Sequence, residues 1–306
     1  AFAATLTHSF FSTNLQDPVS AVHFWIVVGM VWSMKLSAEG ESRLGLLLTE
    51  AGGVAFGLIF TGILVLTFTI VLSVQTLLGA YNYCMGMLWF QREDFVEASA
   101  FLEKASAYRY THDFAVFQNL GMSLYNEKQN EDAARAFQQS LLRHKNNASA
   151  SFYLGKTLSR LDRTEMALTH LKKSVDLNPL SAEYRTGWGE ALGQEGRRED
   201  AVRELGEAIR LDPNAWEAHY ALGYNYKENG DLEGAVEAYE KALELKSGKA
   251  EILNSLAVVY SRQEKFESAN EIFNKLVKDY PRRADYRVNL AVSFLNLGKL
   301  EQARSA

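Results

Sequence analysis

The sequence has little of what most enzymes and metalloproteins use. It has one cysteine, Cys84, which excludes an intrachain disulfide and a metal site built on cysteines. Phosphate-binding loops, dinucleotide fingerprints, paired-carboxylate motifs, nucleophile elbows and zinc signatures are also missing. The sequence therefore predicts no catalytic residue, no cofactor and no metal, and it leaves open whether the protein is an enzyme.

Charge is scarce in residues 1–80, where Lys35 and Arg43 are the basic residues. Most of the 32 basic and 37 acidic residues lie further along the chain, in nearly equal numbers. Such a balance argues against a nucleic-acid partner, because nucleic-acid binding requires a basic stripe. The chain begins at Ala1 without a methionine, and we expect it to be processed or to belong to a longer chain.

Residues 1–80 are predicted to form a membrane region. Residues 51–91 contain no charged residue, and their apolar core predicts a long spanning helix at about 52–78. We expect this helix to continue directly into the first helix of the following domain. Gly53 and Gly57 have the small-xxx-small spacing of a helix-packing contact in membranes. Upstream, the pattern predicts a short spanning helix at about 19–35, preceded by the end of an apolar helix.

The rest of the chain, residues 81–306, repeats one pattern with a period of about 34 residues. Each copy has a small residue that follows a large one, and an alanine comes twelve positions later. The small residues are Gly121, Gly155, Gly189, Gly223, Ala257 and Ala291, and the alanines are Ala133, Ala167, Ala201, Ala235, Ala269 and Ala303. One further copy, with Gly86 and Ala98, precedes them at an offset that is longer by one position. The period predicts pairs of antiparallel helices that approach closely at these small residues.

The pattern also indicates where the helices end. Gly196, Gly230 and Gly298 are expected in the left-handed conformation after the first helix of a pair. Pro179, Pro213 and Pro281 share one repeat position and are expected to stop the second helix. The motif resembles the tetratricopeptide repeat. This resemblance implies a right-handed solenoid of six full repeats and a partial seventh. Together with the predicted transmembrane helices before it, the expected fold is all-α.

A second resemblance is confined to residues 1–35. His8-Ser-Phe-Phe, Asn14-Leu-Gln-Asp-Pro18 and Ala21-Val-His-Phe-Trp25 are similar to the last membrane helices of the O-antigen ligase and polymerase family. It implies a bacterial cytoplasmic membrane protein with its repeats on the periplasmic side, and Lys35 and Arg43 favour the same orientation by the positive-inside rule. That family's catalytic loop has no counterpart in this sequence.

The repeat places a set of aromatic and basic side chains on the inner face of the solenoid, where we expect a protein partner to bind. These groove residues are Tyr220, Tyr224, Lys227, Lys156, Arg160, Arg262, Phe152 and Tyr125. The sequence thus favours a membrane-anchored scaffold for protein–protein interaction within a larger membrane complex.

Two alternatives to the scaffold remain open. One is the C-terminal part of a cell-envelope glycan enzyme of the O-antigen ligase type. The other is an accessory subunit of a pigment or haem protein that would use His8 or His23.

Overall fold

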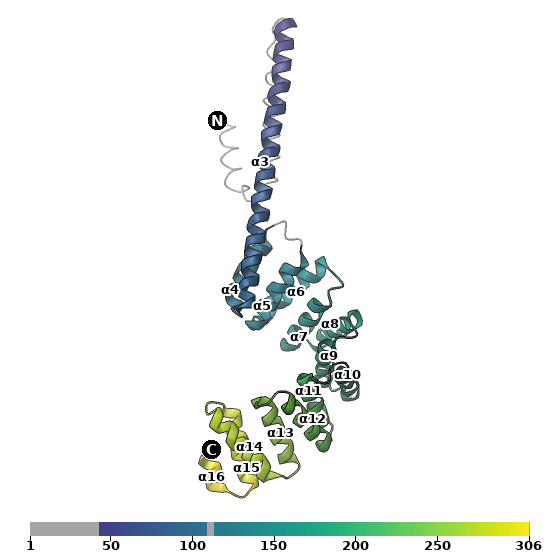
Figure 1. The fold of residues 1–306 in the computed structure, drawn as a ribbon, viewed down its shortest axis with the longest axis vertical. Helices are drawn as coiled ribbons and strands as arrows, with labels where there is room; N and C mark the ends of the chain where they lie inside the picture. Colours follow the sequence, from purple (N-terminus) through teal and green to yellow (C-terminus); the bar gives the residue numbers. More distant parts are fainter. Residues whose placement is uncertain (1–42, 109–112, 306) are drawn as a thin grey trace. The chain divides into compact units, whose positions relative to one another are not determined.

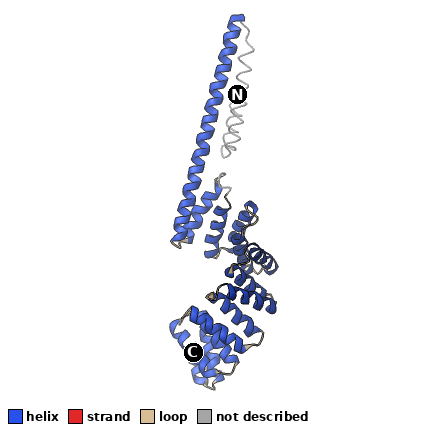
Figure 2. Cartoon of the chain, turned by 45° about the vertical axis from the view of Figure 1, so that its right-hand side comes forward, coloured by secondary structure: helices blue, strands red, loops and turns tan. Residues whose placement is uncertain are grey.

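The structure is a computed structural model that describes residues 43–108 and 113–305. All regular elements in these ranges are helices, and no strand occurs among them (Figure 2). The chain divides into two units, of which the second consists of residues 86–103 and 112–306 and contains most of the repeat region. The two predicted segments before residue 36 lie outside the described residues, so the short spanning helix stays a prediction.

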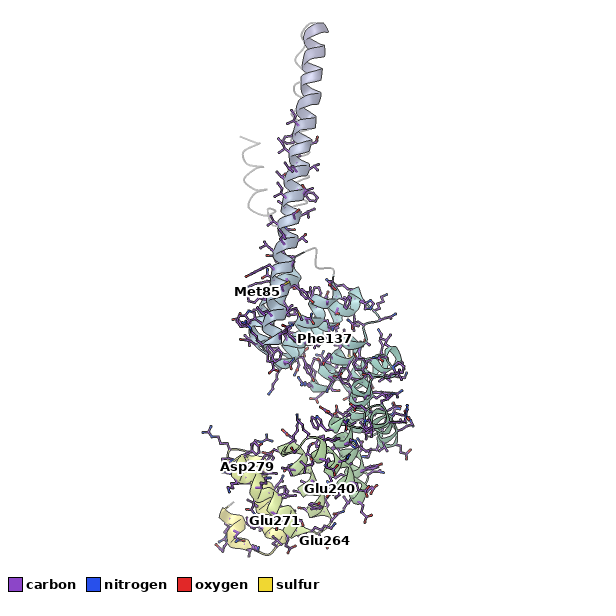
Figure 3. The ribbon with its side chains drawn as sticks, in the orientation of Figure 1. Met85, Phe137, Glu240, Glu264, Glu271 and Asp279 are labelled. Atoms are coloured by element: carbon purple, nitrogen blue, oxygen red, sulfur yellow. The ribbon has the colours of Figure 1, made fainter. Side chains whose placement is uncertain are left out.

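The first described element, α3 (Arg43–Gln91), is one continuous helix of 49 residues. It is longer at both ends than the helix predicted at 52–78. It also contains Gly86, so the apolar run and the first helix of the first repeat share one helix, as the sequence predicted. Between Ile59 and Gln91 this helix is long and apolar enough to cross a membrane. Its apolar side chains project on all sides of the helix axis, and Ile63, Leu66 and Leu77 are among the exposed ones (Figure 3).

The remaining helices form the repeated pairs, which stack in chain order from α5 onward (Figure 1). They are α4 (Phe95–Ala107), α5 (Phe114–Asn126), α6 (Asn130–Arg143), α7 (Ala148–Arg160), α8 (Thr164–Leu177), α9 (Ala182–Gln194), α10 (Arg198–Leu211), α11 (Trp216–Glu228), α12 (Leu232–Leu245), α13 (Ala250–Arg262), α14 (Phe266–Asp279), α15 (Ala284–Asn296) and α16 (Leu300–Ser305). From α5 to α14, each first helix has 13 residues and each second helix 14. The all-α repeat solenoid is thereby confirmed.

The glycines of the first helices lie where the two helices of a pair meet. A Cβ atom added to Gly189 would lie 2.7 Å from Cγ of Leu205 and 3.4 Å from the carbonyl oxygen of Ala201. Gly155 meets Leu171 in the same way, at 2.6 Å. The second-helix alanines of the complete pairs are fully buried, namely Ala98, Ala133, Ala167, Ala201, Ala235 and Ala269. The predicted close approach of small residues is therefore present, and each glycine accepts a large side chain from the facing helix.

The turn inside each pair has one residue in the left-handed region. Gly196, Gly230 and Gly298 have φ angles of 86°, 85° and 71°, as their spacing predicted. The corresponding turns of the other repeats use non-glycine residues with positive φ, namely Glu93, Lys128, Asp162 and Glu264. The three prolines of the repeat each lie two positions after the end of a second helix, at α8, α10 and α14. The turn geometry is thus a property of the repeat position, whichever residue occupies it.

Two glycines of the fourth helical pair make a matched test of this packing. Gly189→Ala should lower the free energy of unfolding by about 1–3 kcal/mol, because the added methyl group overlaps Leu205. Gly206→Ala makes the same chemical change on the exposed side of α10, where no atom lies within 4 Å. It should raise the free energy of unfolding by about 0.5–1 kcal/mol, since alanine favours helix more than glycine does. Urea unfolding followed by circular dichroism measures both, and equal effects would contradict the packing described.

Candidate functional site

The inner face of the solenoid is made by the first helices. From α5 to α15, each first helix contacts the first helix of the next repeat, whereas successive second helices in this range do not contact each other. The second helices therefore lie on the outer side, where they carry exposed acidic residues such as Glu240 and Glu271 (Figure 3). The position after each small residue forms a row along the inner face. It is occupied by Met122, Lys156, Glu190, Tyr224, Val258 and Val292.

Two of the predicted groove cations are already paired inside the protein. Nζ of Lys227 lies 3.0 Å from a carboxylate oxygen of Glu228, and its side chain is 14% exposed. A guanidinium nitrogen of Arg262 lies 3.8 Å from the same oxygen of Glu228. These neighbours hold the pKa of the Glu228 carboxyl below its usual range, mainly through the bond to Lys227. The positive charge of this part of the groove is therefore largely balanced by Glu228.

Arg160 and Arg262 also bind the backbone of the preceding repeat. Nη1 of Arg160 donates a hydrogen bond to the carbonyl oxygen of Tyr125 at 2.9 Å, near the C-terminus of α5. The guanidinium of Arg160 stacks 3.5 Å from the centre of the Tyr125 ring. Nη1 of Arg262 donates in the same way to the carbonyl oxygen of Lys227, at 3.3 Å near the end of α11. Both arginines thus add a charged donor to a carbonyl oxygen that also accepts a backbone N–H at the C-terminal end of the preceding first helix.

The two tyrosines of the predicted groove differ in exposure. The hydroxyl group of Tyr220 lies 3.2 Å from the hydroxyl group of Ser255, and its ring lies 5.5 Å from the buried ring of Tyr239. Tyr224 is 40% exposed, and Nζ of Lys227 lies 4.8 Å from its ring centre. Tyr224 is therefore the tyrosine that offers an open ring face to a partner, while Tyr220 mainly joins two repeats.

The two aromatic residues predicted at the N-terminal side of the groove are buried. Phe152 is 1% exposed, and its ring packs 4.8 Å from the ring of Tyr184 in the next repeat. Tyr125 is 9% exposed because Arg160 and Tyr153 cover its ring. Phe152 is thus a core residue, which corrects the expectation that its side chain lines the groove.

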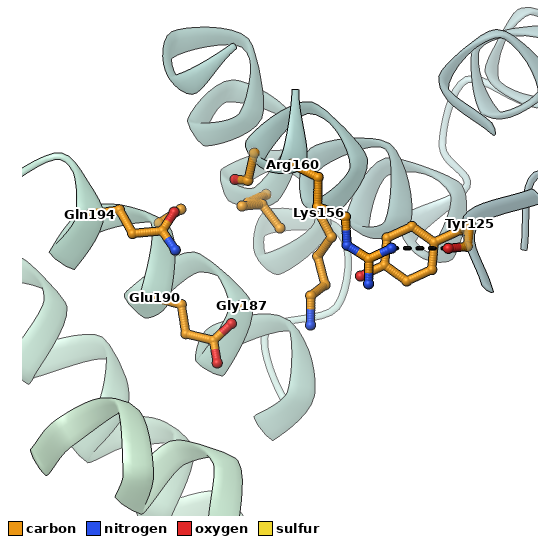
Figure 4. A pocket seen from close by; sticks show the side chains of 9 residues that line it. Tyr125, Lys156, Arg160, Gly187, Glu190 and Gln194 are labelled. Carbon is orange, nitrogen blue, oxygen red and sulfur yellow. Dashed lines mark hydrogen bonds between the residues drawn. The ribbon is translucent and has the colours of Figure 1, made fainter. Parts of the chain in front are cut away.

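A cavity of about 240 Å³ opens between α5, α7 and α9. Lys156 and Arg160 reach it from α7, and Glu190 and Gln194 reach it from α9 (Figure 4). The groove predicted from the sequence contains the two basic residues but not Glu190 and Gln194. The repeat period could have located both residues. Glu190 lies one repeat after Lys156, and Gln194 lies one repeat after Arg160.

The carboxyl group of Glu190 lies in an unusual setting. Burial raises its pKa above the ordinary value, Lys156 opposes this shift, and Glu217 adds to it. No described residue gives Glu190 a hydrogen bond or an ion pair. The cavity thus holds a carboxylate that is partly removed from water and feels the charge of Lys156 without a direct hydrogen bond or ion pair.

The remaining predicted sites are the glycine pair Gly53 and Gly57 and the two histidines His8 and His23. A Cβ atom added to Gly57 would meet nothing within 4 Å, and Gly53 lies in the part of α3 whose side-chain surroundings are not described. Their proposed packing role stays a prediction. His8 and His23 lie outside the described residues. Within the described residues, no group of three histidine, cysteine or acidic side chains could hold a metal ion.

Comparison with known proteins identifies the repeat. Models of the tetratricopeptide repeat match residues 119–182 and 186–250, and another model of the same repeat matches residues 226–287. The chain belongs to the tetratricopeptide repeat family. Neither family match reaches residues 1–35, on which the resemblance to O-antigen ligases depends. No curated protein matches the chain.

Two solved structures share the solenoid fold. A thermophilic repeat protein from Thermus thermophilus is 24% identical, with 60% of this chain and 100% of that chain covered and a TM-score of 0.53. A repeat protein from Parabacteroides merdae is 16% identical, with 74% and 89% covered and a TM-score of 0.62. The MamA protein is 28% identical, with 56% and 94% covered and a TM-score of 0.46. As a tetratricopeptide repeat protein, this chain is a scaffold of a type that serves protein–protein interaction.

The capping role of the groove arginines can be tested on stability. Arg160→Ala should lower the free energy of unfolding by about 1 kcal/mol, because the carbonyl oxygen of Tyr125 loses its charged donor. Gln194→Ala is the control, since Gln194 occupies the same repeat position without a hydrogen bond to the preceding helix. It should change stability by less than about 0.5 kcal/mol. Equal losses in urea unfolding would show that the contact with the Tyr125 carbonyl contributes nothing.

Proposed function

We propose that this protein is a membrane-anchored scaffold that binds an extended segment of a protein partner on the inner face of its repeats. The observation that supports binding is the row of side chains from α7, α9 and α11, which includes an open aromatic ring at Tyr224 and a polar cavity beside Glu190. Tyrosine supplies a large contact area at low cost in conformational entropy, and it is enriched at binding hot spots.

The hydroxyl groups of α3 support anchoring in a membrane. Between Ile59 and Ala80, all five serine and threonine side chains donate to carbonyl oxygens three or four residues earlier in the same helix. They are Thr61, Thr67, Thr69, Ser73 and Thr76. A polar group that is satisfied within its own helix can enter the hydrocarbon region at low cost. The exposed apolar surface of α3 requires a covering, and lipid matches its length and composition.

The proposed location is the bacterial cytoplasmic membrane, with the repeats on the periplasmic side. This orientation derives from Lys35 and Arg43, since the short loop that the sequence predicts between them is assigned to the cytoplasm by the positive-inside rule. Other subunits of a larger membrane complex would contact the protein through the inner face and through the membrane helices. No described residue favours the alternative role in glycan assembly, since the segment that suggested it lies in residues 1–35.

Anchoring is tested by extraction of membranes that carry the full chain. Alkaline carbonate should leave the protein in the pellet, and detergent should release it, because the apolar surface of α3 is solvated by lipid. A variant with Leu66 and Ile70 both changed to Arg places two charges at the centre of the run and should shift the protein to the carbonate-soluble fraction. Release of the unchanged protein by carbonate would rule out the anchor.

Binding on the inner face is tested by partner recovery and affinity. Tyr224→Ala should weaken partner binding about ten-fold and change stability little, because the Tyr224 ring is exposed. Tyr280→Ala is the control, since Tyr280 is similarly exposed but follows the second helix α14. The readout is co-purification from detergent extracts, followed by titration of the recovered partner. Unchanged affinity of the Tyr224 variant would exclude this face as the binding site.

A further inference from the structure

Some charged side chains of the inner face form ion pairs within the protein, and others do not. Lys227 and Arg262 share the carboxylate of Glu228, as described above. Lys156 and Glu190 also lie on adjacent first helices, but neither has a hydrogen bond or an ion pair within the described residues. The nearest aromatic contact of Lys156 is the ring of Phe152, 5.5 Å from Nζ. These two opposite charges therefore remain available to a bound molecule.

The repeat register fixes how the two charges face the cavity. Lys156 and Glu190 occupy the same position on α7 and α9, one repeat apart, and the 240 Å³ cavity lies between them. Each wall contains a second polar group from the next turn of the same helix, namely Arg160 on α7 and Gln194 on α9 (Figure 4). One N–H group of the Arg160 guanidinium donates to the carbonyl oxygen of Tyr125, and the guanidinium has further N–H donors. One wall is thus cationic, and the facing wall presents a carboxylate and an amide.

An extended peptide matches two facing walls of opposite charge, since its successive side chains point to opposite sides. We propose that this cavity recognises an extended partner segment in which an acidic residue is directly followed or preceded by a basic residue. The acidic side chain pairs with Lys156 and Arg160, and the basic side chain pairs with Glu190. This inference rests on the proposed function, and it specifies the partner chemistry at one point of the inner face.

Neither charge alone satisfies the site. A segment with only acidic residues would form an ion pair with Lys156, but its next carboxylate would be repelled by the carboxylate of Glu190. A segment with only basic residues would meet the repulsion of Lys156 and Arg160. The pKa of Glu190 is already raised by burial, so a bound basic side chain would compensate a carboxylate that water solvates poorly. Complementary charges of this kind contribute mainly to specificity, because the wrong pairing is strongly disfavoured.

The experiment uses a displayed library of short random peptides, selected on the full chain in detergent micelles. The selected sequences should be enriched in adjacent acidic–basic pairs relative to the starting library. In a synthetic peptide of the selected consensus, changing either charged residue of the pair to alanine should weaken binding about ten-fold, as measured by fluorescence anisotropy. Raising the salt concentration should weaken binding of the consensus peptide more than binding of a peptide that lacks the charged pair.

Variants of the two walls make the assignment specific. Selection on Glu190→Lys should replace the basic residue of the consensus by an acidic one, and selection on Lys156→Glu should replace the acidic residue by a basic one. Glu190→Gln keeps the shape of the side chain and removes its charge, so it should abolish the preference for the basic residue only. Circular dichroism checks that each variant retains its helices. If a reversal variant fails to fold, Glu190→Gln alone decides the assignment.

Two outcomes overturn the inference, and they have different consequences for the proposed function. If the selected peptides lose affinity with Tyr224→Ala yet show no charge pair and no response to Glu190→Gln, the inference is wrong, while binding on the inner face stands. If no selected peptide responds to Tyr224→Ala, to Glu190→Gln or to the reversal variants, both the inference and the proposed binding face are wrong.

Discussion

The architecture depends on the close approach of two helices at a residue without a side chain. At Gly121, Gly155, Gly189 and Gly223 a large residue of the facing helix occupies the place that a Cβ atom would fill. One such pair cannot bury its own apolar face, so the next pair must stack on it. Because the same steric contact recurs once in every repeat, each later side chain takes a fixed place relative to it. The contact thereby determines which residues face inward.

On such a scaffold, the side chains at equivalent inward positions of successive repeats determine what the protein can bind. Lys156, Glu190 and Tyr224 have the same backbone position in three successive repeats, yet they offer a cation, a carboxylate and an aromatic ring. The residues that form the core are uniform by comparison, since the alanine of every complete pair is fully buried. The repeat thus separates the residues that fold the chain from those that distinguish its partners.

Most of the fold could be predicted from the sequence, because its determinants are local or steric. Small residues, left-handed turns and prolines act within one pair, and their regular spacing was sufficient to locate Gly189, Gly196 and Pro213. The state of the groove residues could not be predicted in the same way. Phe152 is buried by Tyr184, a residue of the next repeat, although Phe152 shares the repeat position of the half-exposed Tyr220. Contacts between repeats decide exposure, and a residue's repeat position does not reveal them.

The repeat position of a charged residue likewise does not reveal its contacts with the neighbouring repeat. These contacts decide which charged residues can bind a partner. Arg160 and Arg262 were predicted from the sequence to face a partner in the groove, but both donate to a carbonyl oxygen at the end of the preceding first helix. There the negative end of the helix dipole already attracts the guanidinium, so part of the charge is used within the fold. Lys156 has no such contact. An anionic group of a partner would therefore gain most from the ammonium of Lys156, and the neighbouring Glu190 would determine what can accompany that group.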